Sequence, residues 1–183
     1  MTIRVVLALC AVVLTVFVGC SSDSTSPTNT DPAISGQSFL RADVNGFAFK
    51  CNATSNMSTE IAPTVTVTAL EGGKYELSIS GESYSMSGIV TLNVSAVVTG
   101  STGTYDIGGS GSPADITSTY NTGSVATAGF YSSEGAEKGT LTITSFNTSK
   151  RRIAGTFTAK LSRLLTSSPA TLDVKSGTFE IGY

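Results

Sequence analysis

The chain has 183 residues, which is room for one domain of ordinary size after short amino-terminal segments. Only 13% of the residues are charged, with 11 Lys and Arg against 13 Asp and Glu, so the formal net charge is −2. This balance, with no basic run, argues against nucleic acid as a partner, because that affinity comes largely from Lys and Arg that neutralise phosphates. Ser, Thr and Gly are abundant instead, as in many exported β-proteins.

The amino terminus has the pattern of a secretory leader. Arg4 is followed by an apolar stretch, residues 5–18, that is shorter than the roughly 20 residues a membrane span needs. Residues 17–20, Phe-Val-Gly-Cys, then resemble the lipobox of bacterial lipoproteins, although Phe stands where Leu is usual. We therefore expect residues 1–19 to be a lipoprotein signal peptide and Cys20 to carry the lipid. The alternative is an ordinary secretory signal with a chance cysteine.

Residues 20–36 are predicted to form a flexible tether, because this polar, Ser- and Pro-containing segment cannot bury enough apolar surface to become ordered. Several acyl chains on Cys20 would anchor the protein stably in a membrane, since each buried methylene contributes about 0.8 kcal/mol. Ser21 and Ser22 stand where an acidic residue would mark inner-membrane retention, which favours the outer membrane. Which face of that membrane the protein occupies stays open.

Cys51 is the one thiol left for the domain, because Cys10 lies in the leader and Cys20 is expected to be lipidated. A disulfide framework is therefore not expected. Cysteine is among the most buried residue types, so we expect Cys51 to be buried and inert. The alternatives are a reactive thiol or a disulfide between chains.

Residues 37–183 alternate polar and apolar side chains with the period of two that is typical of β-strands. Asn45-Gly46 suits a type I′ hairpin turn, and Gly72-Gly73 joins two runs in the same way. We expect one all-β domain of about nine or ten antiparallel strands, built as a barrel or as a two-sheet sandwich. The alternating apolar positions are Val65, Val67 and Ala69; Tyr75, Leu77 and Ile79; Val90, Leu92, Val94, Ala96 and Val98; Leu141 and Ile143; Ile153, Phe157, Ala159 and Leu161.

The last strand changes phase, because Leu172 and Val174 fall on one face and Phe179 and Ile181 on the other. A β-bulge near Ser176-Gly177 is therefore predicted. We also expect Gly155 to permit close packing of strands, and Phe157 and Phe179 to be core aromatics.

Four segments resemble a family of small lipoproteins of Bacteroidota for which no activity is established. They are residues 42–49 (ADVNGFAF), 139–147 (GTLTITSFN), 151–159 (RRIAGTFTA) and 176–183 (SGTFEIGY). The resemblance is vague over residues 55–100. It implies an all-β domain, a lipid anchor and an envelope location, and it brings no catalytic residue.

The absence of histidine excludes Ser-His-Asp triads, Cys-His pairs and imidazole zinc sites. We expect no cofactor, no metal and no enzymatic activity. Asp106 and Asp115 flank the glycine-rich segment 108–113, but they lack the dense spacing of a calcium loop, and the segment resembles a phosphate cradle in composition alone. A hydrolase that uses only carboxylates would draw on Glu71, Glu76, Glu82, Asp106, Asp115, Glu134, Glu137, Asp173 and Glu180.

Large side chains gather in the middle of the chain, at Tyr84, Met86, Tyr105, Tyr120, Phe130 and Tyr131. Exposed members could stack on sugar rings or line a ligand-holding barrel mouth, while core packing is the alternative. Tyr84, Tyr105, Tyr120 and Tyr131 are the candidate ligand-binding residues.

Three functions follow, in order of preference. The first is a non-enzymatic binding module for a glycan or a small apolar ligand, anchored in the outer membrane through Cys20. The second is a structural or accessory subunit with a protein partner in the envelope. The third is a carboxylate-dependent glycan hydrolase.

Overall fold

The computed structural model describes residues 38–52, 62–85, 88–121, 128–133, 138–164 and 170–183. The predicted signal peptide, Cys20 and the tether lie outside these described residues. Within them, apart from one 3-10 turn at Glu71–Gly73, all regular structure is β, which confirms the predicted fold class. No helix of the described part has the length and hydropathy needed to cross a membrane. The strands are β1 (Phe39–Val44), β2 (Phe47–Asn52), β3 (Thr64–Ala69), β4 (Lys74–Ser85), β5 (Gly88–Thr99), β6 (Gly103–Ile107), β7 (Ala114–Asn121), β8 (Gly129–Ser132), β9 (Gly139–Asn147), β10 (Arg152–Arg163) and β11 (Thr171–Gly182).

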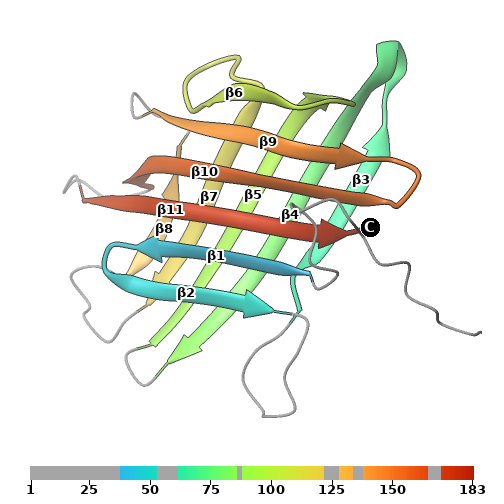
Figure 1. Ribbon diagram of the computed structural model, residues 1–183. Coiled ribbons are helices and arrows are strands. Elements are labelled where there is room, and N and C mark those ends of the chain that lie inside the picture. Colours follow the sequence, from blue (N-terminus) through green and yellow to red (C-terminus); the bar gives the residue numbers. More distant parts are fainter. Residues whose placement is uncertain (1–37, 53–61, 86–87, 122–127, 134–137, 165–169) are drawn as a thin grey trace, which may run out of the picture.

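The strands lie in two layers that cross steeply (Figure 1). The front sheet has the order β2-β1-β11-β10-β9-β6, and the back sheet has the order β8-β7-β5-β4-β3. Along one side the layers are joined, because Ile107 of β6 pairs with Ala114 of β7 and because β8 pairs with both β7 and β10. Strands β10, β9, β6, β7 and β8 thereby form a closed ring. The fold therefore combines the two alternatives that the sequence left open, a sandwich and a barrel.

On the other side of the molecule β2 approaches β4. The backbone N–H of Lys50 donates a hydrogen bond to Oγ of Ser83 over 3.1 Å. A Cβ on Gly81 would lie only 3.0 Å from Sγ of Cys51, so the small residue allows the two strands to come together. Cys51 is fully buried at this contact, as expected.

The core fills the space between the layers, because alternate side chains of each strand point inward. Phe157 and Phe179 are each 2% exposed, with ring centroids 6.4 Å apart, which confirms them as core aromatics. A Cβ on Gly155 would lie 2.6 Å from Cζ of Phe179 and 2.5 Å from the carbonyl oxygen of Thr142, which confirms the close strand packing expected there. All the described strands and this core lie within residues 38–183.

The turns and the bulge also follow the sequence. Asn45 and Gly46 have φ values of 53° and 85°, both positive as a type I′ turn requires, and Gly72-Gly73 lies in the hairpin between β3 and β4. In β11 the pairing with β10 shifts between Phe157 and Ala159, and Ser176 has a φ of 51°. The predicted bulge is therefore present and turns the second half of β11 to the opposite phase.

Candidate functional site

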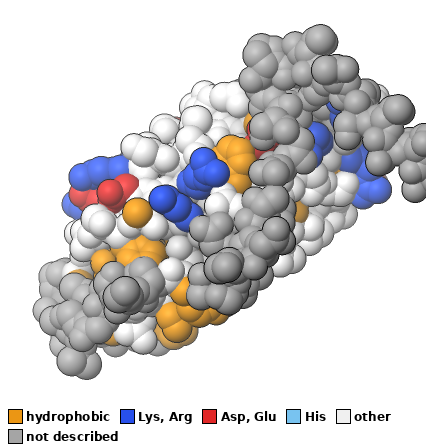
Figure 2. All heavy atoms as spheres, turned by 60° about the horizontal axis from the view of Figure 1, so that its bottom comes forward, with side chains coloured by type: hydrophobic (Ala, Val, Ile, Leu, Met, Phe, Trp, Pro, Cys, Tyr) orange, Lys and Arg blue, Asp and Glu red, His pale blue; other side chains and the backbone are white. Residues whose placement is uncertain are grey.

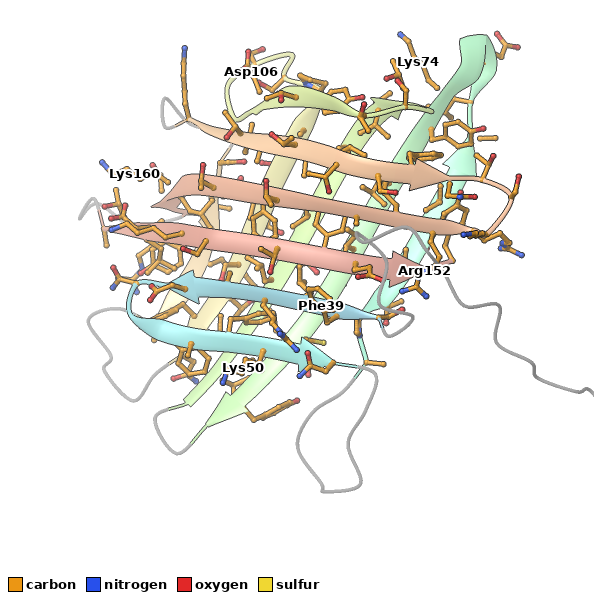
Figure 3. The ribbon with its side chains drawn as sticks, viewed as in Figure 1. Phe39, Lys50, Lys74, Asp106, Arg152 and Lys160 are labelled. Carbon is orange, nitrogen blue, oxygen red and sulfur yellow. The ribbon has the colours of Figure 1, made fainter. Side chains whose placement is uncertain are left out.

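The outer faces of the two sheets differ mainly in their charged residues. Both carry hydroxyls, since in the front sheet the Thr104 hydroxyl contacts that of Thr142 and the Thr140 hydroxyl contacts that of Thr158. The front sheet and its turns carry most of the described cations, of which Lys50, Arg152 and Lys160 are labelled in Figure 3. Figure 2, turned so that the lower side of Figure 1 comes forward, shows scattered Lys and Arg side chains and hydrophobic side chains gathered mainly in the lower left part of the view. Two carboxylates pair with cations here: Arg152 contacts Glu180 at 2.8 Å, and Lys175 contacts Asp173 at 3.2 Å.

The outer face of the back sheet carries mostly hydroxyl and amide groups, with Tyr84, Ile89 and Val97 exposed toward its ends, and we call it the hydroxyl face. Directly paired residues of antiparallel strands share a face, so the register joins these side chains into rows across β3, β4, β5 and β7. Three carboxylates, Glu76, Glu82 and Asp115, lie among them. The members of the hydroxyl face are Thr64, Thr66, Thr68, Ser78, Ser80, Thr91, Asn93, Ser95, Thr117 and Thr119.

One row of this face runs from an aromatic ring to a carboxylate. Phe130 of β8 pairs with Thr119, Thr119 with Thr91, and Thr91 with Glu82. Three strand spacings separate the ends of the row, which is a span of about 14 Å. At the far end the hydroxyl of Tyr84 donates a hydrogen bond to Oε2 of Glu82 over 2.5 Å.

Phe130 borders a groove with a volume of about 320 Å³. Phe130 is 64% exposed, while its backbone is fixed by pairing with β7 and by the N–H of Leu164, which donates to its carbonyl oxygen over 2.8 Å. An exposed aromatic ring on a fixed backbone is a surface on which a flat apolar group can stack. The groove, which we call the Phe130 groove, is lined by Asn93, Thr117, Ser118, Thr119, Phe130, Tyr131 and Leu164.

The four tyrosines singled out from the sequence do not form one cluster. Tyr120 and Tyr131 belong to the core and are 6% and 1% exposed, so a ligand at the surface reaches neither ring face. Tyr105 is half-buried against the core, and its hydroxyl lies 2.9 Å from Oγ1 of Thr99. Tyr84 is 39% exposed, and Glu82 raises its pKa above the ordinary value, first through their hydrogen bond. Of the four, Tyr84 alone belongs to the hydroxyl face.

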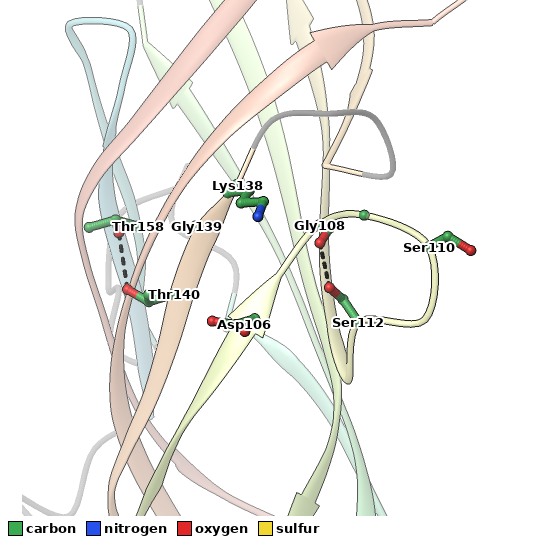
Figure 4. A pocket seen from close by; sticks show the side chains of 9 residues that line it. Asp106, Gly108, Ser110, Ser112, Lys138, Gly139, Thr140 and Thr158 are labelled. Atoms are coloured by element: carbon green, nitrogen blue, oxygen red, sulfur yellow. Dashed lines mark hydrogen bonds between the residues drawn. The ribbon is translucent and has the colours of Figure 1, made fainter.

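A second hollow lies beside the loop between β6 and β7, with a volume of about 520 Å³ (Figure 4). Asp106, Lys138 and Thr140 line it from the strand side, and the glycine-rich loop lines it from the other. The loop is held in place because Oγ of Ser112 donates a hydrogen bond to the carbonyl oxygen of Gly108. No aromatic ring of the described residues lines this hollow, so it offers a sugar ring no surface for stacking.

The carboxylates offer little support for a metal or hydrolase site. No group of three or more Asp, Glu or Cys in the described part of the chain lies close enough to hold a metal ion. Asp106 borders the second hollow, whereas Asp115 accepts a hydrogen bond from Oγ of Ser133 on the other side of the loop. Glu134 and Glu137, two of the nine carboxylates considered for hydrolysis, lie outside the described residues.

Comparisons with family models, with curated proteins and with solved structures found no match to the chain. The fold and the surface alone define the class of the protein. It is an all-β domain of two layers, closed along one side, with a hydroxyl-rich outer face on the back sheet.

Proposed function

We propose that the chain is a lipid-anchored envelope protein whose β-domain binds glycans without catalysing a reaction. The observation that carries the proposal is Phe130, a largely exposed ring on a fixed strand, beside a row of hydroxyl and amide side chains. A binding site of this kind needs an apolar platform and a few fixed polar groups that set orientation. The Phe130 groove has both.

Sugar rings match this surface because each has a face of C–H groups and a rim of hydroxyls. The C–H face stacks on Phe130, and the rim exchanges hydrogen bonds with neighbours such as Asn93 and Thr117. The amide of Asn93 already donates to Oγ1 of Thr117 over 3.3 Å, so both side chains are oriented before a ligand arrives. Orientation in advance lowers the entropy cost of binding.

The row from Phe130 to Glu82 gives the site the length of a short oligosaccharide rather than of one sugar. An oligosaccharide that lies along this row meets the Thr119 and Thr91 hydroxyls in turn and ends at the Glu82 carboxylate. Carboxylates outnumber cations among the described residues of this face. Its one cation is Lys74, at the far end of β4. Neutral or amino sugars therefore fit the face better than acidic glycans do.

The alternative ligand, a small apolar molecule, has less support. Inward positions of both sheets are occupied by the core side chains, including Tyr120 and Tyr131, and the Phe130 groove opens on the surface. The anchor is supported by the lipobox-like residues 17–20 and by the apolar stretch before them. A lipid on Cys20 would hold the domain at a membrane by the tether of residues 20–36.

The test is a screen of residues 21–183 against an array of neutral, amino and acidic oligosaccharides, followed by calorimetric titration of each hit. We expect a neutral or amino oligosaccharide to bind and to raise the melting temperature, since a ligand that prefers the folded state stabilises it. Phe130→Ala should weaken that binding about tenfold or more, because it removes the stacking platform.

The matched control is Val97→Ala, which removes an exposed apolar side chain from the opposite end of the same sheet. It should leave the affinity unchanged. A well-folded sample that binds no oligosaccharide on the array would overturn the proposal. Cross-linking the lipidated protein to its envelope neighbours would then test the accessory-subunit function.

A further inference from the structure

The order of strands ends at β2 on one side and at β3 on the other. The outer edge of β2 is covered, since the N–H of Lys50 donates to Ser83 of β4 and Cys51 packs beside Gly81. The outer edge of β3 is different. No strand in the described part of the chain pairs with it.

The direction of the backbone groups of β3 follows from its hairpin. The N–H of Leu70 donates to the carbonyl oxygen of Lys74 over 2.8 Å, so these two residues form a hydrogen-bonded pair. Such pairs alternate along antiparallel strands, so Thr68, Thr66 and Thr64 bond to β4. The N–H and C=O groups of Val65 and Val67 therefore point away from β4, toward the open edge.

Natural edge strands are usually protected by charged residues, by proline within the strand or by bulges. β3 has none of these between Thr64 and Ala69, and its pairing with β4 is regular. Its side chains are hydroxyls on the outer face, with Val65 and Val67 half-buried on the inner face. An edge of this kind accepts another strand without burying a charge.

The sequence of β3 indicates which strand can pair with this open edge. Thr64-Val-Thr-Val-Thr68 reads the same in both directions, so an antiparallel copy centred on Thr66 places Thr opposite Thr and Val opposite Val. In this register Val65 exchanges backbone hydrogen bonds with Val67 of the other copy, and the half-buried valines cover one another. A twofold contact needs a surface that is complementary to itself, and β3 meets that condition.

We propose that the protein forms a twofold dimer in which β3 pairs with β3 of a second copy. The two back sheets then become one continuous sheet, with both hydroxyl faces on the same side. The pairing does not depend on glycan binding. If both occur, the dimer presents two Phe130 grooves on the same side of the sheet, and avidity on a polymeric glycan follows.

Sedimentation velocity of residues 21–183 over a wide range of concentrations tests the dimer. We expect the wild-type protein to shift from monomer to twice the monomer mass as concentration rises. In the Thr66→Lys variant two ammonium groups face each other at the twofold axis, so the variant should remain monomeric. Thr66→Glu should do the same, and an equimolar mixture of the two variants should regain the dimer mass.

The matched control is Ser78→Lys, because Ser78 pairs directly with Thr66 and has the same exposed face, but lies one strand further from the edge. It should dimerise like the wild type. Melting curves of all variants establish that they are folded. A wild type that stays monomeric throughout, or a Thr66→Lys variant that still dimerises, would overturn the proposal. Glycan affinity measured on the Thr66→Lys variant tests the proposed function separately.

Discussion

The two sheets of this domain share one core but differ in the regularity of their strand pairing and in the charged residues on their outer faces. The front sheet contains the bulge at Ser176, a glycine pressed against Phe179, and paired charges on its outer face. The back sheet pairs without a shift from β3 to β7 and covers its outer face with hydroxyls. The comparison shows that the register shifts are confined to the front sheet, between β1 and β11, β10 and β11, and β9 and β10. The back sheet pairs in regular register, which places the side chains of the hydroxyl face in continuous rows.

The largest difference should be between the aromatic residues of the two sheets. Phe179→Ala in the front sheet should lower the free energy of unfolding by about 4 kcal/mol, because it leaves a cavity beside Phe157. Phe130→Ala in the back sheet should lower it by less than about 1 kcal/mol, because most of that ring already faces water. Urea denaturation measures both. Equal losses would mean that Phe130 is a structural residue rather than a binding surface.

A second difference concerns tolerance of added volume. Gly155→Val should cost about 3 kcal/mol, because its Cβ alone would lie 2.6 Å from the Phe179 ring and 2.5 Å from a backbone oxygen. Ser78→Val on the hydroxyl face adds a similar branched side chain at an exposed strand position and should change stability by less than about 0.5 kcal/mol. A Gly155→Val protein as stable as the wild type would contradict the close packing.

A third difference lies within the front face itself. Arg152→Leu removes the partner of Glu180, whose side chain is only 6% exposed, and should cost about 2 kcal/mol since a buried carboxylate loses its cation. Lys175→Leu breaks the pair with Asp173, which is 44% exposed, and should cost less than about 0.5 kcal/mol. Chemical denaturation at two salt concentrations separates the two cases, because salt screens the exposed pair more strongly.

The fold class, the hairpin turns and the bulge could be predicted because each depends on local chemistry. A period of two, a pair of residues that tolerates positive φ, and a change of phase in β11 are all visible over a few residues. The closure of the ring could not be predicted. The four-residue β8 gives little periodic signal, and its pairing with β10, two strands further along the chain, depends on tertiary packing rather than on local sequence.

Strand phase would have sorted the four tyrosines better than their chemistry did. Tyr105 has the phase of Ile107, and Tyr120 has the phase of Ile116, so both point inward. Tyr84 has the phase opposite to Leu77 and Ile79, so it points outward. For Phe130 and Tyr131 the phase requires one ring inside and one outside, and only the position of β8 between β7 and β10 decides which.

The smallest expected effect is on the pKa of Tyr84, whose hydroxyl lies at the Glu82 end of the row that begins at Phe130. Its pKa is raised mainly because its hydroxyl donates to Glu82, and the neighbouring carboxylate also opposes a second negative charge. Glu82→Gln removes that charge, so the pKa of Tyr84 should fall toward its ordinary value of 10.0. The phenolate absorbance of wild type and variant, each compared with its Tyr84→Phe counterpart, isolates this group.

Tyr183 is the internal control for that titration. Its pKa is raised chiefly by partial burial, with no contribution from Glu82, so Glu82→Gln should leave it unchanged. A raised folded-state pKa means that the stabilisation from each tyrosine is present below pH 10 and is lost as the pH rises through the folded value. Because Tyr84 is exposed, the loss of its contribution above the folded-state pKa should hardly change the melting temperature. If the pKa of Tyr84 is the same in the wild type and in Glu82→Gln, the hydrogen bond between Tyr84 and Glu82 is not fixed. Glu82 would then no longer define the far limit of the glycan site.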